Sequence, residues 1–167
     1  CAVRLEDLAE YTARLTEVFE KYGTTGTWYA HASVGCLHVR PVLNLKNEAD
    51  TKKMRSIAEE AFAMVREYKG SHSGEHGDGL VRSEFHGLMF GSPLVSVFKQ
   101  VKDTFDNRGI LNPGKIVNAP KMDNPKLFRF KPDYEVAMPE TALNWVEWGG
   151  FSGAVEMCNN NGACRKR

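Results

Sequence analysis

Three amphipathic periods constrain the fold of this chain more than any other feature of its sequence. Each places apolar side chains three, four or seven residues apart, so that they share one face of a helix. The apolar positions are Leu5, Leu8, Leu15, Val18, Phe19 and Tyr22; Met54, Ile57, Ala61, Val65 and Tyr68; and Leu94, Val97, Phe98, Val101 and Phe105. We therefore predict helices over residues 5–22, 47–68 and 92–105, each with one buried face.

Residues at the ends of these periods are typical of helix boundaries. Asn47 precedes the second period, with Asp50 three residues later, as an N-cap does. Ser92-Pro93 opens the third as a cap followed by a first helical residue. A glycine follows each period, at Gly23, Gly70 and Gly109. The first of these glycines lies where a left-handed C-terminal cap is expected.

The segment between the first two helices, residues 26–45, is rich in β-branched and aromatic residues. Over residues 37–43 apolar positions alternate with mainly polar ones, which predicts a strand whose polar face carries His38 and Arg40. A second extended stretch is expected over residues 80–85. The order helix, strands, helix, strand, helix predicts an α+β fold with an antiparallel sheet and helices packed on one side.

Charge, hydropathy and cysteine spacing disfavour several classes of protein. The 22 basic and 21 acidic residues give a net charge of +1, so there is no basic excess to neutralise nucleic acid. The longest mainly apolar run, residues 87–98, is shorter than the roughly 20 residues that span a bilayer. Only Cys158 and Cys164 lie near each other, which is not a disulfide framework. We expect a cytoplasmic protein, with the inner face of the membrane as a peripheral alternative.

The ends of the chain predict a fragment of a longer polypeptide. Cys1 directly precedes a helical period, and Arg167 follows a cysteine motif that has only begun. Prolines punctuate residues 118–157, which show no clear helical period and are expected to form an irregular tail. The predicted organisation is a partial domain at 1–117, a linker or tail at 118–157, and the start of a truncated module at 158–167.

Histidine, glutamate and glycine are concentrated in two short motifs. His31-Ala-Ser-Val-Gly-Cys-Leu-His38 contains the first, and Gly74-Glu75-His76-Gly-Asp-Gly79 the second. Two histidines across a glycine-containing turn, with a Glu-His pair from elsewhere, suit Zn²⁺, Mn²⁺ or Fe²⁺. Any one of these histidines alone is better explained as an ordinary strand or turn residue. A fourth ligand is available in Cys36, His72 or His76.

These motifs, together with Asn112-Pro-Gly-Lys115-Ile116, resemble the C-terminal, or cap, domain of FAD-linked oxidases. That family includes the D-lactate, glycolate and D-2-hydroxyglutarate dehydrogenases, and the resemblance covers most of residues 2–117. It implies a ferredoxin-like cap domain with an antiparallel sheet. It also implies that FAD is bound mainly by an N-terminal domain outside this chain.

The resemblance assigns roles to particular residues. His31, His38 and Glu75 correspond to the family's divalent-metal ligands, and His76 to its proposed base. Between the two histidines, Ser33, Val34 and Cys36 replace the family's Gly, Asp and Asn, which affects local hydrogen bonding. The family motif gives Asn112 and Lys115 a flavin contact, with a plain turn as the alternative.

Two arginines are candidates to hold the carboxylate of a 2-hydroxy acid substrate. They are Arg40 and Arg82, because a guanidinium offers a planar fork of two donors. The alternative for each is a surface ion pair, and Glu84 is the candidate partner of Arg82. With a metal at His31, His38 and Glu75, the set implies oxidation of the hydroxy acid by hydride transfer to flavin.

The segment 140–165 resembles the branch of the family that continues into an iron–sulfur module. Cys158 and Cys164 are half of the four thiolates that such a cluster needs, so the other ligands are expected beyond Arg167. The implied partners are the small hydroxy acid, the FAD-binding and iron–sulfur parts of the same polypeptide, and an electron acceptor, without nucleic acid. We expect the fragment by itself to be inactive, with two reduced thiols and no cluster.

Two other functions fit parts of the sequence. The histidine cluster also suits a non-catalytic scaffold with a structural zinc ion, which would be closed by four protein ligands. A metal-dependent hydrolase is a third reading of the same ligands, although the Asn112–Lys115 motif gives it no support. Whether the metal site is open or closed separates the first two functions.

Overall fold

The computed structural model describes residues 1–131, 134–159 and 161–166. The chain divides into two compact units, Cys1–Pro132 and Asp133–Arg167, and each is described by itself. Asn160 and Arg167, which belong to the predicted iron–sulfur segment, lie outside the described residues. The predicted boundaries at residues 117 and 157 stay predictions.

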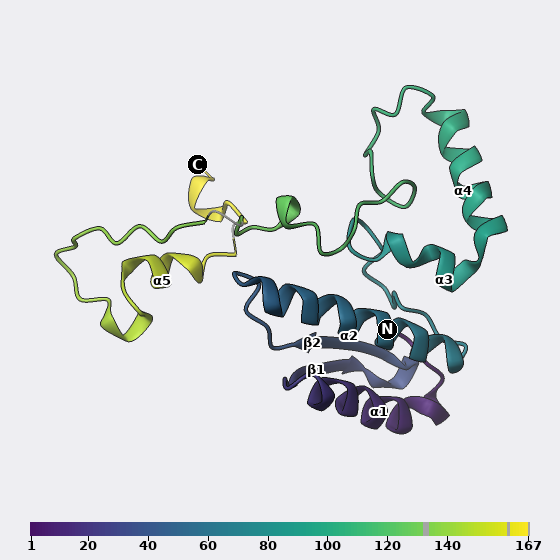
Figure 1. Ribbon diagram of the computed structural model, residues 1–167, viewed down its shortest axis with the longest axis horizontal. Coiled ribbons are helices and arrows are strands. Elements are labelled where there is room, and N and C mark those ends of the chain that lie inside the picture. The colour runs from purple at the N-terminus through teal and green to yellow at the C-terminus, as the bar shows by residue number, and fades with distance from the viewer. Residues whose placement is uncertain (132–133, 160, 167) are drawn as a thin grey trace. The chain divides into compact units, whose positions relative to one another are not determined.

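The first unit contains most of the regular structure (Figure 1). A 3₁₀ turn at Leu5–Asp7 leads into helix α1, and an antiparallel hairpin and the long helix α2 follow. The elements are α1 Leu8–Lys21, β1 Gly26–His31, β2 Cys36–Pro41, α2 Glu48–Glu67, α3 His86–Phe90 and α4 Ser92–Phe105. Further 3₁₀ turns lie at Ala32–Val34, Ser83–Phe85 and Pro125–Leu127.

The hairpin separates an apolar face from a polar one, as the alternation predicted. Trp28 pairs with Val39 and Ala30 with Leu37, and the ring of Trp28 packs on Phe19 of α1. On this face the hairpin joins the core formed by α1 and α2, whose buried members include Tyr11, Leu15, Ile57 and Val65. The intervening residues, such as Tyr29 and His38, belong to the opposite face. The α+β prediction of an antiparallel sheet with helices on one side is therefore confirmed.

The caps expected for the first two helices are present, with one difference at the end of the second. The side chain of Asn47 accepts a hydrogen bond from the Asp50 amide, and Gly23 is left-handed with φ of 63°. At the end of α2 it is Lys69, with φ of 53°, that adopts the left-handed conformation rather than Gly70. A Cβ at Gly70 would lie 2.3 Å from the carbonyl oxygen of Ala2, so close approach requires this glycine.

The N-terminal residues tie the hairpin to the loop that carries the second histidine motif. Ala2 exchanges two backbone hydrogen bonds with Ser71, both of 2.8 Å. On its other side the chain bonds to β2: Val3 donates to Gly35, and Leu37 donates to Cys1. The segment Cys1–Val3 therefore connects β2 to residue 71, immediately before the loop that carries Glu75.

The prediction of a strand over residues 80–85 is wrong. This segment turns instead, because Arg82 N–H donates to Asp78 and Phe85 N–H donates to Arg82, and Ser83–Phe85 is a 3₁₀ turn. Phe85 is buried with its ring 4.8 Å from that of Phe62. The apolar residues that suggested a strand are thus held by local turns and by packing against α2.

The third helix forms where it was predicted, but its environment is different. Gly91, not Ser92, is the N-cap residue of α4. None of the residues of α4, all of which the structure describes, is buried, and Phe105 is 82% exposed. Contact with the rest of the unit comes from Phe98, whose ring packs on those of His86 and Phe90. The prediction that this helix buries its apolar face is wrong.

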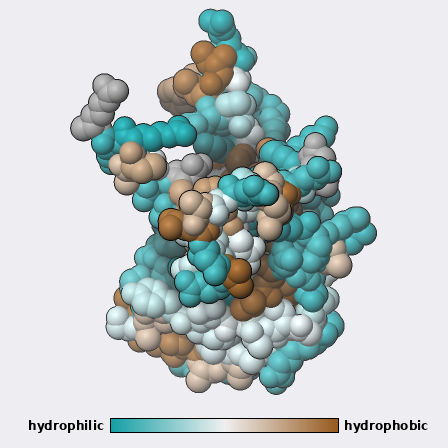
Figure 2. Space-filling view, turned by 90° about the vertical axis from the view of Figure 1, so that its left-hand side faces the viewer, coloured by the Kyte–Doolittle hydropathy of each residue, from teal (hydrophilic) through white to brown (hydrophobic). Residues whose placement is uncertain are grey.

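Apolar side chains are also exposed elsewhere, and Figure 2 shows brown patches among the hydrophilic residues on the face it displays. None of the helices in the described ranges is both long enough and apolar enough to cross a membrane.

The second unit, which contains part of the segment predicted to be an irregular tail, has some regular structure. A 3₁₀ turn at Val146–Trp148 leads into a short helix, α5 Phe151–Glu156, which was not predicted from the sequence. The ring of Trp145 packs edge-on against that of Phe151, 5.6 Å between centroids. The aromatic residues of this segment thus order one another locally.

Acid is expected to loosen the loop after α4, because Asp106 holds it. The Asp106 carboxylate accepts hydrogen bonds from Lys102 Nζ and from the amides of Ile110 and Leu111, which lower its pKa to about 2. A depressed pKa contributes stability above the ordinary value near 4, and that contribution is lost as pH falls from about 4 towards 2. Asp106→Asn should therefore lower the urea midpoint at pH 7, with a difference that shrinks by pH 2. An equal difference at both pH values would contradict this role.

Candidate metal and substrate site

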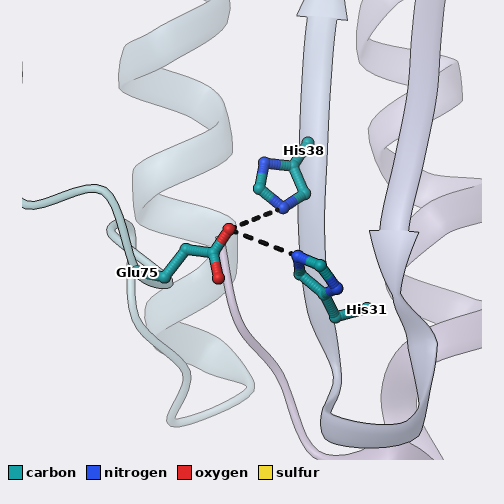
Figure 3. A group of neighbouring side chains, drawn as sticks. All are labelled: His31, His38 and Glu75. Carbon is teal, nitrogen blue, oxygen red and sulfur yellow. Dashed lines mark ion pairs between the residues drawn. The ribbon is translucent and has the colours of Figure 1, made fainter.

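The predicted metal ligands come together on the polar side of the hairpin. Glu75 reaches from the loop after α2 towards His31 at the end of β1 and His38 in β2 (Figure 3). Its Oε1 lies 3.4 Å from His31 Nε2 and 2.9 Å from His38 Nε2. The three donor atoms lie within 4.8 Å of one another.

Local structure explains why two histidines seven residues apart meet. The 3₁₀ turn Ala32–Val34 and the left-handed Gly35, with φ of 68°, reverse the chain between them. The rings of His31 and His38 then lie 5.1 Å apart, and Tyr29 on the same face packs against both. The turn therefore sets the spacing of the two imidazoles.

The donor set fits a divalent transition metal. His38 Nε2 is buried and, although 2.9 Å from the carboxylate of Glu75, it makes no hydrogen bond of acceptable geometry. Atoms that approach closely without forming a hydrogen bond are arranged as ligands of a common ion are. Two imidazoles and one carboxylate suit Zn²⁺, Mn²⁺ or Fe²⁺. His31 and Glu75 are both more than 40% exposed, so the set is open to solvent on one side.

His76 lies beside these residues without being enclosed. Its Nε2 is 3.1 Å from Glu75 Oε1, and its ring centroid is 4.8 Å from that of His38. The side chain is 60% exposed. A histidine in this position is free to reach a molecule that approaches the three ligands.

A groove of about 510 Å³ leads to this cluster. Its apolar side is formed by core residues of β2 and α2, including Leu37, Ile57 and Phe62. The polar residues that line it are Cys1, His38, Arg40, His72, Glu75, His76 and Arg82. Both arginines predicted to hold a carboxylate therefore line the same groove as His38, Glu75 and His76, whereas His31 does not line it.

Arg82 does not form the ion pair with Glu84 that was considered as its alternative role. Glu84 pairs with Arg55 of α2, with 3.1 Å between Arg55 Nη2 and Glu84 Oε2. Arg82 instead donates a hydrogen bond from Nη1 to the carbonyl oxygen of Gly77. This bond orients the guanidinium along the loop that carries Glu75.

The other predicted site residues lie elsewhere. Asn112 and Lys115 are exposed, their side chains are hydrogen-bonded to each other at 3.3 Å, and neither lines the groove. Cys158 and Cys164 are exposed in the second unit. Of the three suggested fourth ligands, His76 adjoins the metal cluster, whereas Cys36 is buried with its Sγ against Gly74.

His72, the third of these, belongs to a second cluster that sequence reasoning missed. His72 and His86 are almost fully buried, and Asp78 lies between them. His86 Nε2 is 2.6 Å from Asp78 Oδ2, and His72 Nε2 is 3.8 Å from Asp78 Oδ1. His72 precedes the second motif and Asp78 belongs to it, but nothing in the spacing of His86 relates it to them.

Burial and pairing have opposite effects on the protonation of this cluster. Burial lowers the pKa of His72, although Asp78 and the nearby Arg82 backbone favour its protonated ring. Burial by itself raises the pKa of Asp78, but the hydrogen bond with His86 and further polar contacts outweigh it and lower the pKa. The cluster therefore combines a carboxylate with an imidazole held towards its neutral form.

Comparison with known proteins identifies the family. The family model described as FAD linked oxidases, C-terminal domain, matches residues 1–116. D-2-hydroxyglutarate dehydrogenase from Escherichia coli is 33% identical over 166 residues, covering 95% of this chain and 15% of that protein. The Pseudomonas putida protein of the same name is 34% identical over 167 residues, covering 98% and 16%.

A shorter match is found to D-lactate dehydrogenase from Archaeoglobus fulgidus. It is 34% identical over 111 residues, covering 66% of this chain and 24% of that protein. The chain thus spans less than a quarter of each of these three relatives. The chain belongs to the FAD-linked oxidases and contains their C-terminal domain.

Proposed function

We propose that this chain supplies the substrate- and metal-binding side of a flavin-dependent dehydrogenase that oxidises a D-2-hydroxy acid to the 2-oxo acid. The observation that supports this most directly is a single groove lined by His38, Glu75, His76, Arg40 and Arg82, with His31 next to the first two. The flavin would be bound by a part of the polypeptide outside this chain. This agrees with the small share of each relative that the chain covers.

Each group of residues at the site has its own role in the proposed reaction. A metal held by His31, His38 and Glu75 would act as a Lewis acid on the substrate hydroxyl. Bound flavin would accept the α-hydrogen with its electron pair. His76 takes the hydroxyl proton, since its exposed ring lies beside the ligands and imidazole is the most common general base in enzymes. Arg40 and Arg82 hold carboxylate oxygens and so orient the substrate in the groove.

We further propose that the substrate is a dicarboxylate of the size of D-2-hydroxyglutarate. Two guanidinium groups line the groove, and a dicarboxylate is able to engage both. Four relatives that match 95% or more of this chain are all named D-2-hydroxyglutarate dehydrogenase, whereas the D-lactate dehydrogenase described above matches 66%. Lactate has one carboxylate and would leave one arginine without an anionic partner.

An open metal site favours catalysis over the scaffold function. A structural zinc ion is closed by four protein ligands, whereas a catalytic one keeps a position for water or substrate. The side chains of His31, Glu75 and His76 are between 44% and 60% exposed. We therefore propose that the open side of this cluster is where the hydroxy acid enters.

We also propose that Cys158 and Cys164 contribute to an iron–sulfur centre that receives electrons from the flavin. Both thiols are exposed, and the Pseudomonas putida relative matches 98% of this chain. Two thiolates are half of the usual ligand set, so the remaining ligands must come from outside residues 158–164.

Steady-state kinetics of the flavin-containing protein that carries this chain would test the substrate proposal. Arg40→Lys and Arg82→Lys should each raise KM for D-2-hydroxyglutarate by about tenfold or more, because lysine lacks the bidentate fork. One of them should affect D-lactate much less, since that arginine would hold the distal carboxylate. Arg4→Lys, at an exposed pair with Glu6 and Asp7, is the matched control and should leave both KM values unchanged. Equal effects on both substrates from both groove variants would contradict the dicarboxylate assignment.

A further inference from the structure

The buried cluster of His72, Asp78 and His86 has polar atoms that the protein itself does not satisfy. His72 is 1% exposed, and neither of its ring nitrogens has a partner in hydrogen-bond geometry. Asp78 Oδ1 is also buried and without a hydrogen bond. Buried polar atoms are nearly always paired, because an unpaired one has lost its hydrogen bonds to water without replacement. Three such atoms in one cluster call for a ligand.

The contacts of the two ring nitrogens of His86 also indicate that the cluster binds a ligand. Its Nδ1 is 3.2 Å from the carbonyl oxygen of Ile116 and its Nε2 is 2.6 Å from Asp78 Oδ2, and both partners are acceptors. A neutral ring carries one N–H and donates to only one of them, so the other ring nitrogen directs a lone pair at an acceptor. Two lone pairs at this distance repel each other unless a second proton or a metal cation lies between them.

The distance between His72 and Asp78 favours a metal cation over a second proton on His86. A second proton on His86 would satisfy Asp78 Oδ2 but would leave His72 Nε2 and Asp78 Oδ1 unpaired, 3.8 Å apart. That separation is too long for a hydrogen bond. It approaches the distance of about 3.3 Å between two ligands that each lie about 2.0 Å from one tetrahedral ion. The 2.6 Å between His86 Nε2 and Asp78 Oδ2 is shorter than this distance, so one cation bound by all three residues would hold these two atoms slightly farther apart.

The surroundings of the cluster are mainly apolar, although His72 also lines the groove and a smaller cavity adjoins the cluster. The rings of Phe62 and Phe90 pack on His72, and those of Phe90 and Phe98 pack on His86. A cavity of about 270 Å³ adjoins His72 and Asp78 and is lined by Ser71 and Ser73. It has room for an ion and a water ligand. The aromatic shell makes an unpaired carboxylate or imidazole costly and a bound cation correspondingly favourable.

We propose that His72, Asp78 and His86 bind a second divalent transition metal, with Zn²⁺ as the ion best suited to two imidazoles and a carboxylate. Water from the adjoining cavity would complete the coordination. The ion would fix the loop 72–78 to α3, and through His86 to the backbone at Ile116. This site is separate from the groove cluster and does not depend on the proposed dehydrogenase activity.

Metal content and Co²⁺ absorption of the 167-residue chain would test the second site. In a His31→Ala/His38→Ala variant, which lacks the groove ligands, we expect about one equivalent of Zn²⁺ after saturation and dialysis, against about two in the unaltered chain. Its Co²⁺ form should show visible ligand-field bands without a thiolate charge-transfer band, which excludes the cysteines. In this background EDTA should lower the melting temperature and Zn²⁺ should restore it.

A third change in the same background assigns the ion to the buried cluster. Asp78→Asn removes the anionic ligand at constant size and should abolish Zn²⁺ binding, whereas Asp103→Asn, at an exposed pair with Lys99, should retain it. If Asp78→Asn does not fold, His72→Gln takes its place. Absence of Zn²⁺ from the double histidine variant, a thiolate spectrum, or retention of Zn²⁺ after Asp78→Asn would each overturn the proposal.

Discussion

Replacing His38 with alanine is expected to lower the affinity of the groove for Zn²⁺ by about 100-fold or more, since it removes one of three ligands. His38 is the least exposed of the three, with 11% of its side chain accessible, and its Nε2 is 2.9 Å from Glu75 Oε1. Water entering the space left by the imidazole replaces it poorly as a ligand. Competition with a chromophoric chelator would measure the change.

Two comparisons make this test specific to the ligand atoms. Thr27→Ala removes an exposed side chain from the neighbouring strand and should leave Zn²⁺ affinity unchanged. Glu75→Gln keeps the size of the third ligand but removes its charge, and it should weaken binding in the same direction as His38→Ala. If His38→Ala bound Zn²⁺ as tightly as the unaltered chain, with the buried cluster disabled by Asp78→Asn, the assignment of the groove ligands would be wrong.

Gly35→Ala is expected to be among the most destabilising single-methyl changes in the chain. Gly35 has φ of 68°, and a Cβ there would lie 1.9 Å from the carbonyl oxygen of Val3. The backbone conformation alone costs an alanine about 1–2 kcal/mol. Relief of the clash requires Cys1–Val3 to move away from β2, which breaks the hydrogen bond from Val3 to Gly35. A further loss of roughly 1–3 kcal/mol is expected from this overpacking.

Gly23→Ala separates the two contributions. Gly23 has nearly the same φ, 63°, but a Cβ there meets nothing within 4 Å. It should lose only the conformational part, so the two variants should differ in urea unfolding free energy by roughly 1–3 kcal/mol. The Gly35 variant should also bind groove metal more weakly, because the turn sets the spacing of His31 and His38. Equal destabilisation by the two substitutions would show that the approach of Val3 is not constraining.

The sequence by itself determined the features that depend on short-range periodicity and local chemistry. The apolar positions of α1 and α2 recur at helical spacing and pack on each other, and Asn47 caps α2 through its own side chain. Alternation over residues 37–41 separated Val39 from His38 on opposite faces of β2. The turn between His31 and His38 is local as well, so these two ligands were predictable as a pair.

Only the tertiary structure decided which surfaces those elements cover and which distant side chains meet. The apolar face of α4 has the same period as that of α1, but it is exposed because burial depends on the neighbouring elements rather than on spacing. The sequence of residues 80–85 predicted a strand, but the carbonyl oxygens of Asp78 and Arg82 accept backbone hydrogen bonds that form turns there.

The buried cluster is the clearest case of this difference. His86 lies on a short helix 14 residues from His72, and nothing in that interval predicts that their rings approach to 5.9 Å. Packing of Phe62, Phe90 and Phe98 brings them together around Asp78. The physical reason is that such a site is created by non-local burial, which a pattern of neighbouring residues does not encode.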